Sequence, residues 1–200
     1  MKKLKILVSG SNSQIAKEKK IISKKFNNLK FFFLTKSKLD ICDSKKIKET
    51  ILSYKIDIFI NCAAYTNVDE AENNKNQCKK INFFAVKNLA LLCKSMNLIL
   101  IHFSTDYVFN GNSKNMYNEN SKTNPINYYG YTKLKADEAI LKISPSGMIV
   151  RTSWVFSSFG KNFVKTIYNF NILQKEIFVV SDQYGTPTFA KDIAINLCKI

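Results

Sequence analysis

The chain has 200 residues, of which 46% are hydrophobic, and a formal net charge of +16. That length is typical of one domain, or of one domain with part of a second, and the apolar content suffices for a core. The apolar runs, such as 31–34 and 98–101, are far shorter than the ~20 residues of a membrane span, so a transmembrane protein is not expected.

Short apolar runs alternate with longer amphipathic segments along the chain. The predicted strands are Leu4–Ser9, Lys30–Leu34, Ile56–Cys62, Leu98–Ser104, Gly147–Thr152 and Ile177–Val180. The predicted helices are Gln14–Lys25, Ser44–Tyr54, Asn74–Met96, Tyr129–Ile143, Asn162–Phe170 and Ala190–Ile200. Continuous apolar strands separated by helices indicate an α/β fold with a parallel sheet that is covered on both faces.

Two further segments are irregular or terminal. The stretch Asn110–Asn127 is rich in Asn, Ser and Lys and predicts a long surface loop. The first residues, Met1–Val8, begin with lysines, but their apolar part is too short for the core of a secretory signal. We therefore expect a first strand of a cytoplasmic protein.

The positive charge is almost entirely lysine, because Arg151 is the single arginine among 31 basic residues. Nucleic-acid readers rely on clustered arginine for bidentate contacts, whereas these lysines are spread along the whole chain. A genome biased toward A/T-rich codons accounts for the abundance of Lys, Asn, Ile and Phe. We therefore expect no nucleic-acid partner, although the charge would attract an anionic small substrate.

Cysteine and histidine usage argues against a disulfide framework and a zinc site. The cysteines are Cys42, Cys62, Cys78, Cys93 and Cys198, an odd number without a CxxC pair. Reduced thiols in the cytoplasm fit this pattern better. The single histidine, His102, is interpreted as a polar residue at the end of a buried strand.

The first chemical motif is a turn between the first strand and the first helix, Gly10–Ala16. Dinucleotide folds place glycines at such a turn so that the backbone approaches the pyrophosphate at the helix N-terminus. Only Gly10 remains of that glycine pattern, because Ser13 and Ala16 hold the other two positions. A strand, a turn with one glycine and a helix are by themselves weak support for such a site.

Three further segments follow predicted strands or open a helix. Asn61–Thr66 places small residues at a strand end, and Ser104–Phe109 closes the next strand. In the following helix Tyr129 and Lys133 are four residues apart, so that both lie on one face. A lysine ammonium near a phenol favours the phenolate and lowers its pKa from about 10, which suits acid–base chemistry.

These motifs, in this order, resemble the extended short-chain dehydrogenase/reductases, and among them the dTDP-4-dehydrorhamnose reductase family. The resemblance also rests on five further segments and runs from residue 4 to about residue 195. These segments are Leu39–Ile41 with Val68–Glu72, and Arg151–Phe156, Asn162–Lys165 and Asp182–Thr188. It implies a Rossmann-type doubly wound parallel sheet and reduction of the 4-keto group of dTDP-4-dehydro-L-rhamnose with NADH or NADPH, for polysaccharide biosynthesis.

The resemblance also implies roles for individual residues. Tyr129 is then the proton donor, Lys133 lowers its pKa and holds the nicotinamide ribose, and Thr105 stabilises the carbonyl oxygen. The implied cofactor-binding residues are Gly10, Ser13, Gln14, Ile15, Asp40, Ile41, Ala63, Ala64, Tyr65, Tyr129 and Lys133, and the implied substrate-binding residues are Thr105, Asp106 and Trp154. No metal site is implied, and a homodimer is compatible with the family.

Two features depart from the family pattern, namely the eroded glycine turn and the end of the chain at Ile200. We expect a dinucleotide-binding domain over 1–155 and an incomplete substrate-binding lobe over 156–200. A non-catalytic NAD(P)-binding regulatory subunit, an inactive homologue and another nucleotide-sugar epimerase or dehydratase remain alternatives.

Overall fold

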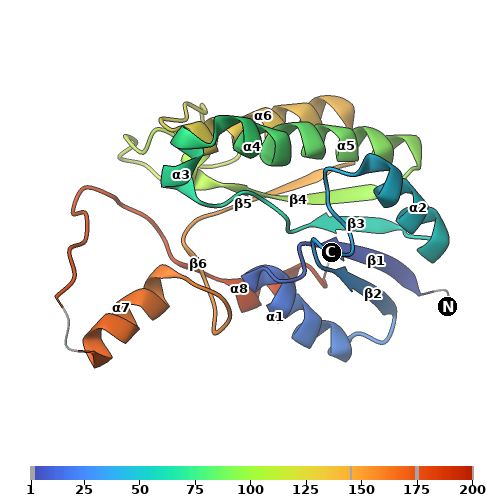
Figure 1. Cartoon of the computed structure of the whole chain (residues 1–200), viewed down its shortest axis with the longest axis horizontal. Helices are drawn as coiled ribbons and strands as arrows, with labels where there is room; N and C mark the ends of the chain where they lie inside the picture. Colours follow the sequence, from blue (N-terminus) through green and yellow to red (C-terminus); the bar gives the residue numbers. More distant parts are fainter. Residues whose placement is uncertain (1–2, 145, 174–175, 200) are drawn as a thin grey trace.

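The computed structural model describes residues 3–144, 146–173 and 176–199. Its centre is a five-stranded sheet with the order β2-β1-β3-β4-β5, in which all neighbouring strands are parallel (Figure 1). The strands are β1 Leu4–Ser9, β2 Leu29–Leu34, β3 Ile58–Asn61, β4 Ile99–Thr105 and β5 Met148–Thr152. This order confirms the predicted doubly wound α/β fold, and it reverses direction between β1 and β3.

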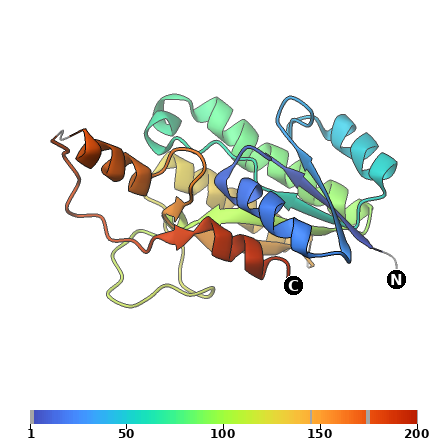
Figure 2. The same cartoon turned by 90° about the horizontal axis from the view of Figure 1, so that it is seen from below.

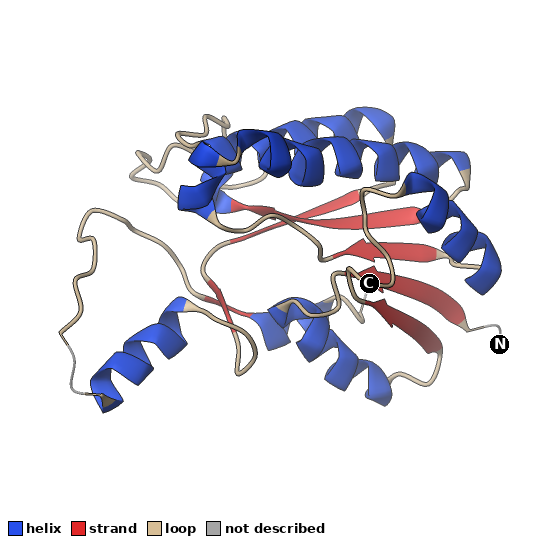
Figure 3. Ribbon diagram, in the orientation of Figure 1, coloured by secondary structure: helices blue, strands red, loops and turns tan. Residues whose placement is uncertain are grey.

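Helices cover both faces of this sheet, as Figures 1 and 3 show. One face carries α2 Ser44–Tyr54, α3 Val68–Asn73, α4 Lys75–Lys79, α5 Val86–Ser95 and α6 Tyr128–Ile143. The other face carries α1 Gln14–Ile22 and α8 Ala190–Asn196, which lie side by side in front of the sheet in Figure 2. A π-helical turn, Lys80–Ala85, joins α4 to α5, and short 3-10 turns occupy Ser23–Lys25 and Asp106–Val108.

Polar N-cap residues determine where five of the helices begin. Each cap side chain accepts a hydrogen bond from the backbone N–H three residues later, which satisfies a donor that the first helical turn leaves free. These caps are Ser13, Asp43, Asn67, Asn127 and Asn162. Among them, Ser13 also lines the cleft at the carboxyl edge of the sheet.

The core consists of two layers, one on each face of the sheet. Alternate residues of each buried strand point to opposite faces, so Leu7, Phe59 and Leu100 face α2, α5 and α6. Their neighbours Val8 and Ile60 face α1 and α8. Burial of each such side chain contributes about 1.5–3 kcal/mol. The sheet is thus held from both sides, which fixes the carboxyl ends of its strands.

The remaining elements extend beyond the carboxyl edge of the sheet. A two-stranded parallel ribbon pairs β6 Val155–Phe156 with β7 Thr188–Phe189. Between them α7 Phe163–Ile172 and a long loop project outward (Figure 1). Among the described residues, no helix is long and apolar enough to cross a bilayer.

Several element predictions were wrong in detail. The predicted strand Ile177–Val180 is irregular and exposed, because no neighbouring strand pairs with it. The predicted helix Asn74–Met96 is divided by the π-helical turn, and Ala190–Ile200 ends at Asn196, with Ile200 outside the described residues. Sequence patterns also missed α3 and the β6–β7 ribbon, which are too short to give a periodic signal.

Candidate functional site

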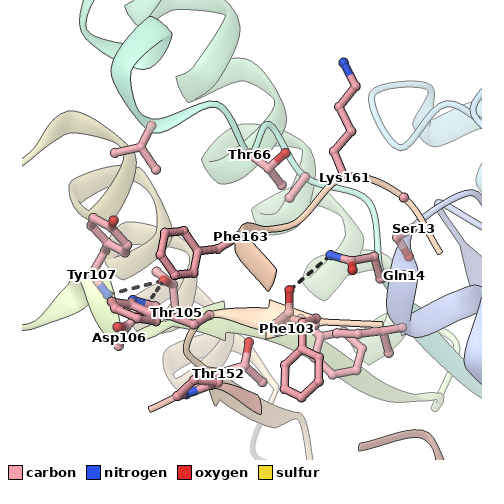
Figure 4. Close-up of a pocket in the computed structure, with 18 of the residues that line it drawn as sticks. Ser13, Gln14, Thr66, Phe103, Thr105, Asp106, Tyr107, Thr152, Lys161 and Phe163 are labelled. Carbon is pink, nitrogen blue, oxygen red and sulfur yellow. Dashed lines mark hydrogen bonds between the residues drawn. The ribbon is translucent and has the colours of Figure 1, made fainter. Parts of the chain in front are cut away.

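A cleft of about 750 Å³ opens at the carboxyl edge of the sheet, where the strand order reverses (Figure 4). This edge is where doubly wound folds bind their ligands. Nine predicted site residues line it: Ser13, Gln14, Ile15, Ala64, Thr105, Asp106, Tyr129, Lys133 and Trp154. The other five, Gly10, Asp40, Ile41, Ala63 and Tyr65, are not part of its lining.

The turn after β1 is shaped by contact with the end of β3. Gly10 has a positive φ of 64°, and a Cβ there would lie 2.6 Å from the backbone nitrogen of Ala63. Only glycine therefore fits this position without strain. Ser13 starts α1, and its hydroxyl accepts a hydrogen bond from the Ala16 N–H at 3.3 Å. The serine in place of a glycine thus serves as a helix cap.

Gln14 links the first helix to the segment beyond the sheet. Its amide nitrogen donates to the carbonyl of Val155 at 3.1 Å, and its oxygen accepts from Asn162 at 2.8 Å. Figure 4 shows the side chain reaching across the cleft from α1. Gln14 therefore forms part of one wall and connects it to the start of α7.

The loop after β2 lies apart from the cleft. Ile41 is 4% exposed and belongs to the core, and the carboxylate of Asp40 accepts from the backbone N–H of Cys42 at 2.9 Å. The structure therefore gives both residues a local structural contact, and their implied contact with adenine stays a prediction.

The loop after β3 is fixed by Asn82, a residue that sequence analysis missed. The Asn82 side chain accepts from the Tyr65 N–H at 2.8 Å and donates to the Tyr65 carbonyl at 3.0 Å. It comes from the π-helical turn, a feature that is frequent at functional sites. This pair of hydrogen bonds fixes the backbone beside Ala64, which lines the cleft.

Three hydroxyl and carboxyl groups meet at the end of β4. Thr105 donates to Asp106 at 3.0 Å, and the ring of Tyr129 packs edge-on against Tyr107 with centroids 5.8 Å apart. Burial raises the pKa of Tyr129 to about 12, although the nearby Thr105 hydroxyl acts in the opposite direction. Burial also raises the pKa of Asp106.

Lys133 is buried beneath this group, with 2% of its surface exposed. Its Nζ donates to the carbonyl of Phe103 and lies 3.0 Å from Nε2 of His102. Burial lowers the pKa of Lys133 to about 8. Burial is the largest influence on the pKa of Tyr129, and the expected lowering of that pKa by Lys133 stays a prediction.

A row of polar side chains connects Lys133 to the other strands. The register places Ser9 opposite Asn61 and Asn61 opposite His102. Ser9 donates to the Asn61 oxygen at 2.7 Å, and the Asn61 nitrogen lies 3.1 Å from Nδ1 of His102. His102 is buried on a strand as interpreted, but it lies in the middle of β4 and not at the strand end. Its contact with Lys133 was not foreseen, although polar residues on successive apolar strands gave a signal.

A second buried charge lies one turn further along α6. Asp137 is 1% exposed and accepts from Ser104 at 2.9 Å and from Arg151 at 3.2 Å. Burial raises the pKa of this carboxyl, whereas the hydroxyl of Ser104 and the charges of Lys133 and Arg151 lower it. The only arginine of the chain thus serves a buried ion pair behind the site.

Trp154 forms the outer wall together with the segment that follows it. Its backbone has a positive φ of 45°, and its indole contacts Gly185, where a Cβ would lie 2.5 Å from the ring. The ring centroid of Phe163 is 5.6 Å away. Trp154 is therefore held between α7 and the loop before β7, facing the groups of β4.

The strand order and the place of the cleft put this fold in the Rossmann-type class of doubly wound α/β folds. UDP-glucose 4-epimerase from Brucella ovis in complex with NAD shares this fold, with a TM-score of 0.80 at 18% identity over 96% of this chain and 71% of that one. Within that class, the chain belongs to the family described as RmlD substrate binding domain, whose model matches residues 4–200.

Similar proteins of known name agree with this family. A dTDP-4-dehydrorhamnose reductase from Aggregatibacter actinomycetemcomitans is 34% identical over 98% of this chain and 67% of its own length. The crystal structure of dTDP-4-dehydrorhamnose reductase from Bacillus anthracis in complex with NADP gives a TM-score of 0.92 at 32% identity, over 98% of this chain and 70% of that one. The chain spans between 51% and 69% of the length of the curated relatives it matches.

Proposed function

We propose that this chain carries the cofactor-binding part of an NADPH- or NADH-dependent reductase acting on the 4-keto group of dTDP-4-dehydro-L-rhamnose. The product would be dTDP-L-rhamnose, a sugar donor for polysaccharide. The observation that carries the proposal is the convergence of Thr105, Tyr129 and Lys133 on one cleft at the carboxyl edge of the sheet. The named relatives support the choice of substrate.

The residues around the first turn fit a dinucleotide. Gly10 lets the turn after β1 pack directly against Ala63, where a Cβ would lie 2.6 Å from the backbone nitrogen. Gln14 and Ile15 are the first two residues of α1, so their N–H groups have no intrahelical partner and are available to a pyrophosphate. When bound, a reduced nicotinamide cofactor supplies the hydride.

The side chains of the cleft would orient the keto group and provide one proton. The Thr105 hydroxyl would bind the carbonyl oxygen, and the Tyr129 phenol would give that oxygen its proton. Because burial raises the pKa of Tyr129 to about 12, the phenol carries the proton to be given at neutral pH. Asp106 and Trp154 would contact the sugar, since both line the same wall.

The proposal is tested by mixing the purified chain with NADPH and dTDP-4-dehydro-L-rhamnose and following the loss of nicotinamide absorbance. We expect turnover in the wild type and a loss of about 10²–10⁴-fold in Tyr129→Phe, since the proton donor is removed. Tyr131→Phe is the matched control, because Tyr131 lies on the same helix but is 40% exposed. This control should retain the wild-type rate.

Two results would contradict the proposal. Equal rates in Tyr129→Phe and wild type would remove Tyr129 from the chemistry. Calorimetric binding of NADPH without any turnover of the keto sugar would favour a non-catalytic binding subunit instead.

We further propose that the protein works in the cytoplasm. All five cysteines are free thiols in the described residues, which suits a reducing compartment. Fractionation of cells that express a tagged chain tests this proposal, and recovery of the protein outside the cytoplasmic fraction would contradict it.

A further inference from the structure

The polar row beneath the cleft consists of Ser9, Asn61, His102 and Lys133. Which of its groups donate and which accept hydrogen bonds follows from one backbone N–H. The Ala63 N–H is 3.1 Å from the Asn61 side-chain oxygen. A backbone N–H can only donate, so the atom facing it must be the amide oxygen of Asn61. Ser9 donates to the same oxygen at 2.7 Å, so the amide has little freedom to turn over.

The amide orientation in turn sets the tautomer of His102. With its oxygen occupied, Asn61 presents its NH₂ group to Nδ1 of His102 at 3.1 Å. Nδ1 must therefore accept, so a neutral imidazole carries its proton on Nε2. Burial lowers the pKa of His102 well below its ordinary value, so the imidazole is neutral.

The Nε2–H group then points at Lys133, whose Nζ lies 3.0 Å away. An ammonium has three N–H donors and no lone pair, so it cannot accept this hydrogen. An uncharged amine can accept it while donating to the carbonyl of Phe103. The observed arrangement is therefore the one that an uncharged Lys133 satisfies.

We propose that Asn61 and His102 position Lys133 and control its charge. Asn61 keeps the imidazole proton on Nε2, and Lys133 is protonated only when that imidazole proton is on Nδ1 instead. His102 is on this view a positioning residue, which acts on Tyr129 through the charge of Lys133. The inference rests on the proposed function only where it concerns the role of Lys133 in catalysis. The tautomer of His102 does not depend on cofactor or substrate.

The other titratable groups near Lys133 are compatible with this switch. Asp137 lies one turn further along α6, and Cys78 approaches from α4; both favour the charged lysine, against the stronger effect of burial. Burial itself raises the pKa of the Cys78 thiol, and Asp137 is already paired with Arg151. His102 is thus the neighbour whose hydrogen bonding must change when Lys133 is protonated.

The experiment uses the fact that the chain has a single histidine. Nitrogen-15 spectra of the imidazole in the full chain, recorded from about pH 6 to about pH 10, report directly which nitrogen is protonated. We expect Nε2–H at alkaline pH and a change to Nδ1–H as the pH falls through the pKa of Lys133, about 8. One unchanged tautomer across the range, or Nδ1–H at alkaline pH, would overturn the proposal.

Asn61→Asp gives the sharpest variant because it changes one group and almost no volume. The carboxylate still accepts hydrogen bonds from Ser9 and the Ala63 N–H. It can also accept one from a protonated Nδ1 of His102, so that Nε2 is free to accept a hydrogen bond from the Lys133 ammonium. We expect Nδ1 to be protonated at every pH, and the Lys133 midpoint to rise by about 1–3 units through the added negative charge. An unaltered tautomer in this variant would also contradict the proposal.

Two further variants keep the test decisive if Asn61→Asp does not fold. Lys133→Met removes the titrating amine, so the imidazole should keep Nε2–H across the whole range; a switch that persists would refute the coupling. Ser9→Ala is the matched control within the same row, and it should retain the wild-type switch because Ala63 still fixes the amide. None of these spectra needs substrate, so failure here is distinct from failure of the proposed reaction.

Discussion

Apolar side chains are buried in the core of the sheet region and exposed in the segment beyond it. In the sheet region, apolar residues are covered from both faces, and even Lys133 is enclosed and hydrogen-bonded. In the outer segment, residues 163–173 and 176–187, helix α7 has no buried residue, and Phe178 is 95% exposed. Burial thus depends on contact with the sheet and not on the apolar character of the residue.

The comparison also separates two contributions to the cleft. The sheet region supplies the groups with perturbed pKa values, Tyr129 and Lys133, on a rigid support. The outer segment supplies wall residues such as Phe163 and Val180. The packed region therefore supplies the buried ionisable groups of the cleft, and the outer segment supplies exposed wall residues.

The largest effect is expected from a cavity in the packed layer. Leu100→Ala removes a side chain with no exposed surface at the centre of β4 and should lower the free energy of unfolding by about 2–5 kcal/mol. Leu141→Ala, at a leucine of α6 that is 64% exposed, is the control and should change it by less than about 0.5 kcal/mol. Urea denaturation measures both, and equal losses would show that the layer is not packed as described.

The next effect concerns pH and the buried lysine. Unfolded, Lys133 keeps its proton up to its ordinary pKa of 10.5; folded, it loses the proton near 8. Between these values the unfolded state binds more protons, so this lysine makes the folded state more stable as the pH rises. Relative to Lys133→Met, the wild type should gain about 3 kcal/mol between pH 8 and pH 10.5.

The matched control for this effect is Lys142→Met, at an exposed lysine near the end of the same helix. Its stability difference from the wild type should stay constant over the same pH range. If the Lys133→Met difference is equally flat, Lys133 is solvated and not enclosed. Comparing variants is essential because the buried Tyr129 and Cys62, whose pKa values are raised to about 12, act in the opposite direction at high pH.

The smallest effect is expected in the outer segment. Phe178→Ala should change the free energy of unfolding by less than about 0.5 kcal/mol, because the ring touches little that is buried. The same substitution at Phe59, which has no exposed surface, should cost about 3–5 kcal/mol. A comparable loss at both positions would erase the contrast between the two regions.

Sequence patterns predicted most elements of the sheet region and also the helix α7, expected at Asn162–Phe170 and observed at Phe163–Ile172, but they were wrong for the strand Ile177–Val180. The strand Leu4–Ser9 and the helix Ser44–Tyr54 were predicted at their observed bounds, because apolar runs and Asp43 at a helix start are local signals. Ile177–Val180 has an equally apolar run, but a strand needs a partner, which the local sequence cannot specify.

The site residues also fall into a group that the sequence predicted and a group that it did not. The sequence determined the order of the motifs, and therefore that Thr105, Tyr129 and Lys133 would meet at the carboxyl edge of a parallel sheet. It did not indicate that Ser9, Asn61 and His102 share one register, or that Asn82 holds the loop beside them. Those contacts join residues far apart in the chain, and only the folded sheet brings them within hydrogen-bond distance.

The charge of Lys133 illustrates the division most clearly. Lys133 follows Tyr129 by four residues, and this spacing led to the expectation of a charged lysine that lowers the pKa of the phenol. The direction of both pKa shifts was decided by burial, which is a property of tertiary packing. A sequence specifies which groups are present, whereas desolvation and hydrogen bonding in the fold set their protonation.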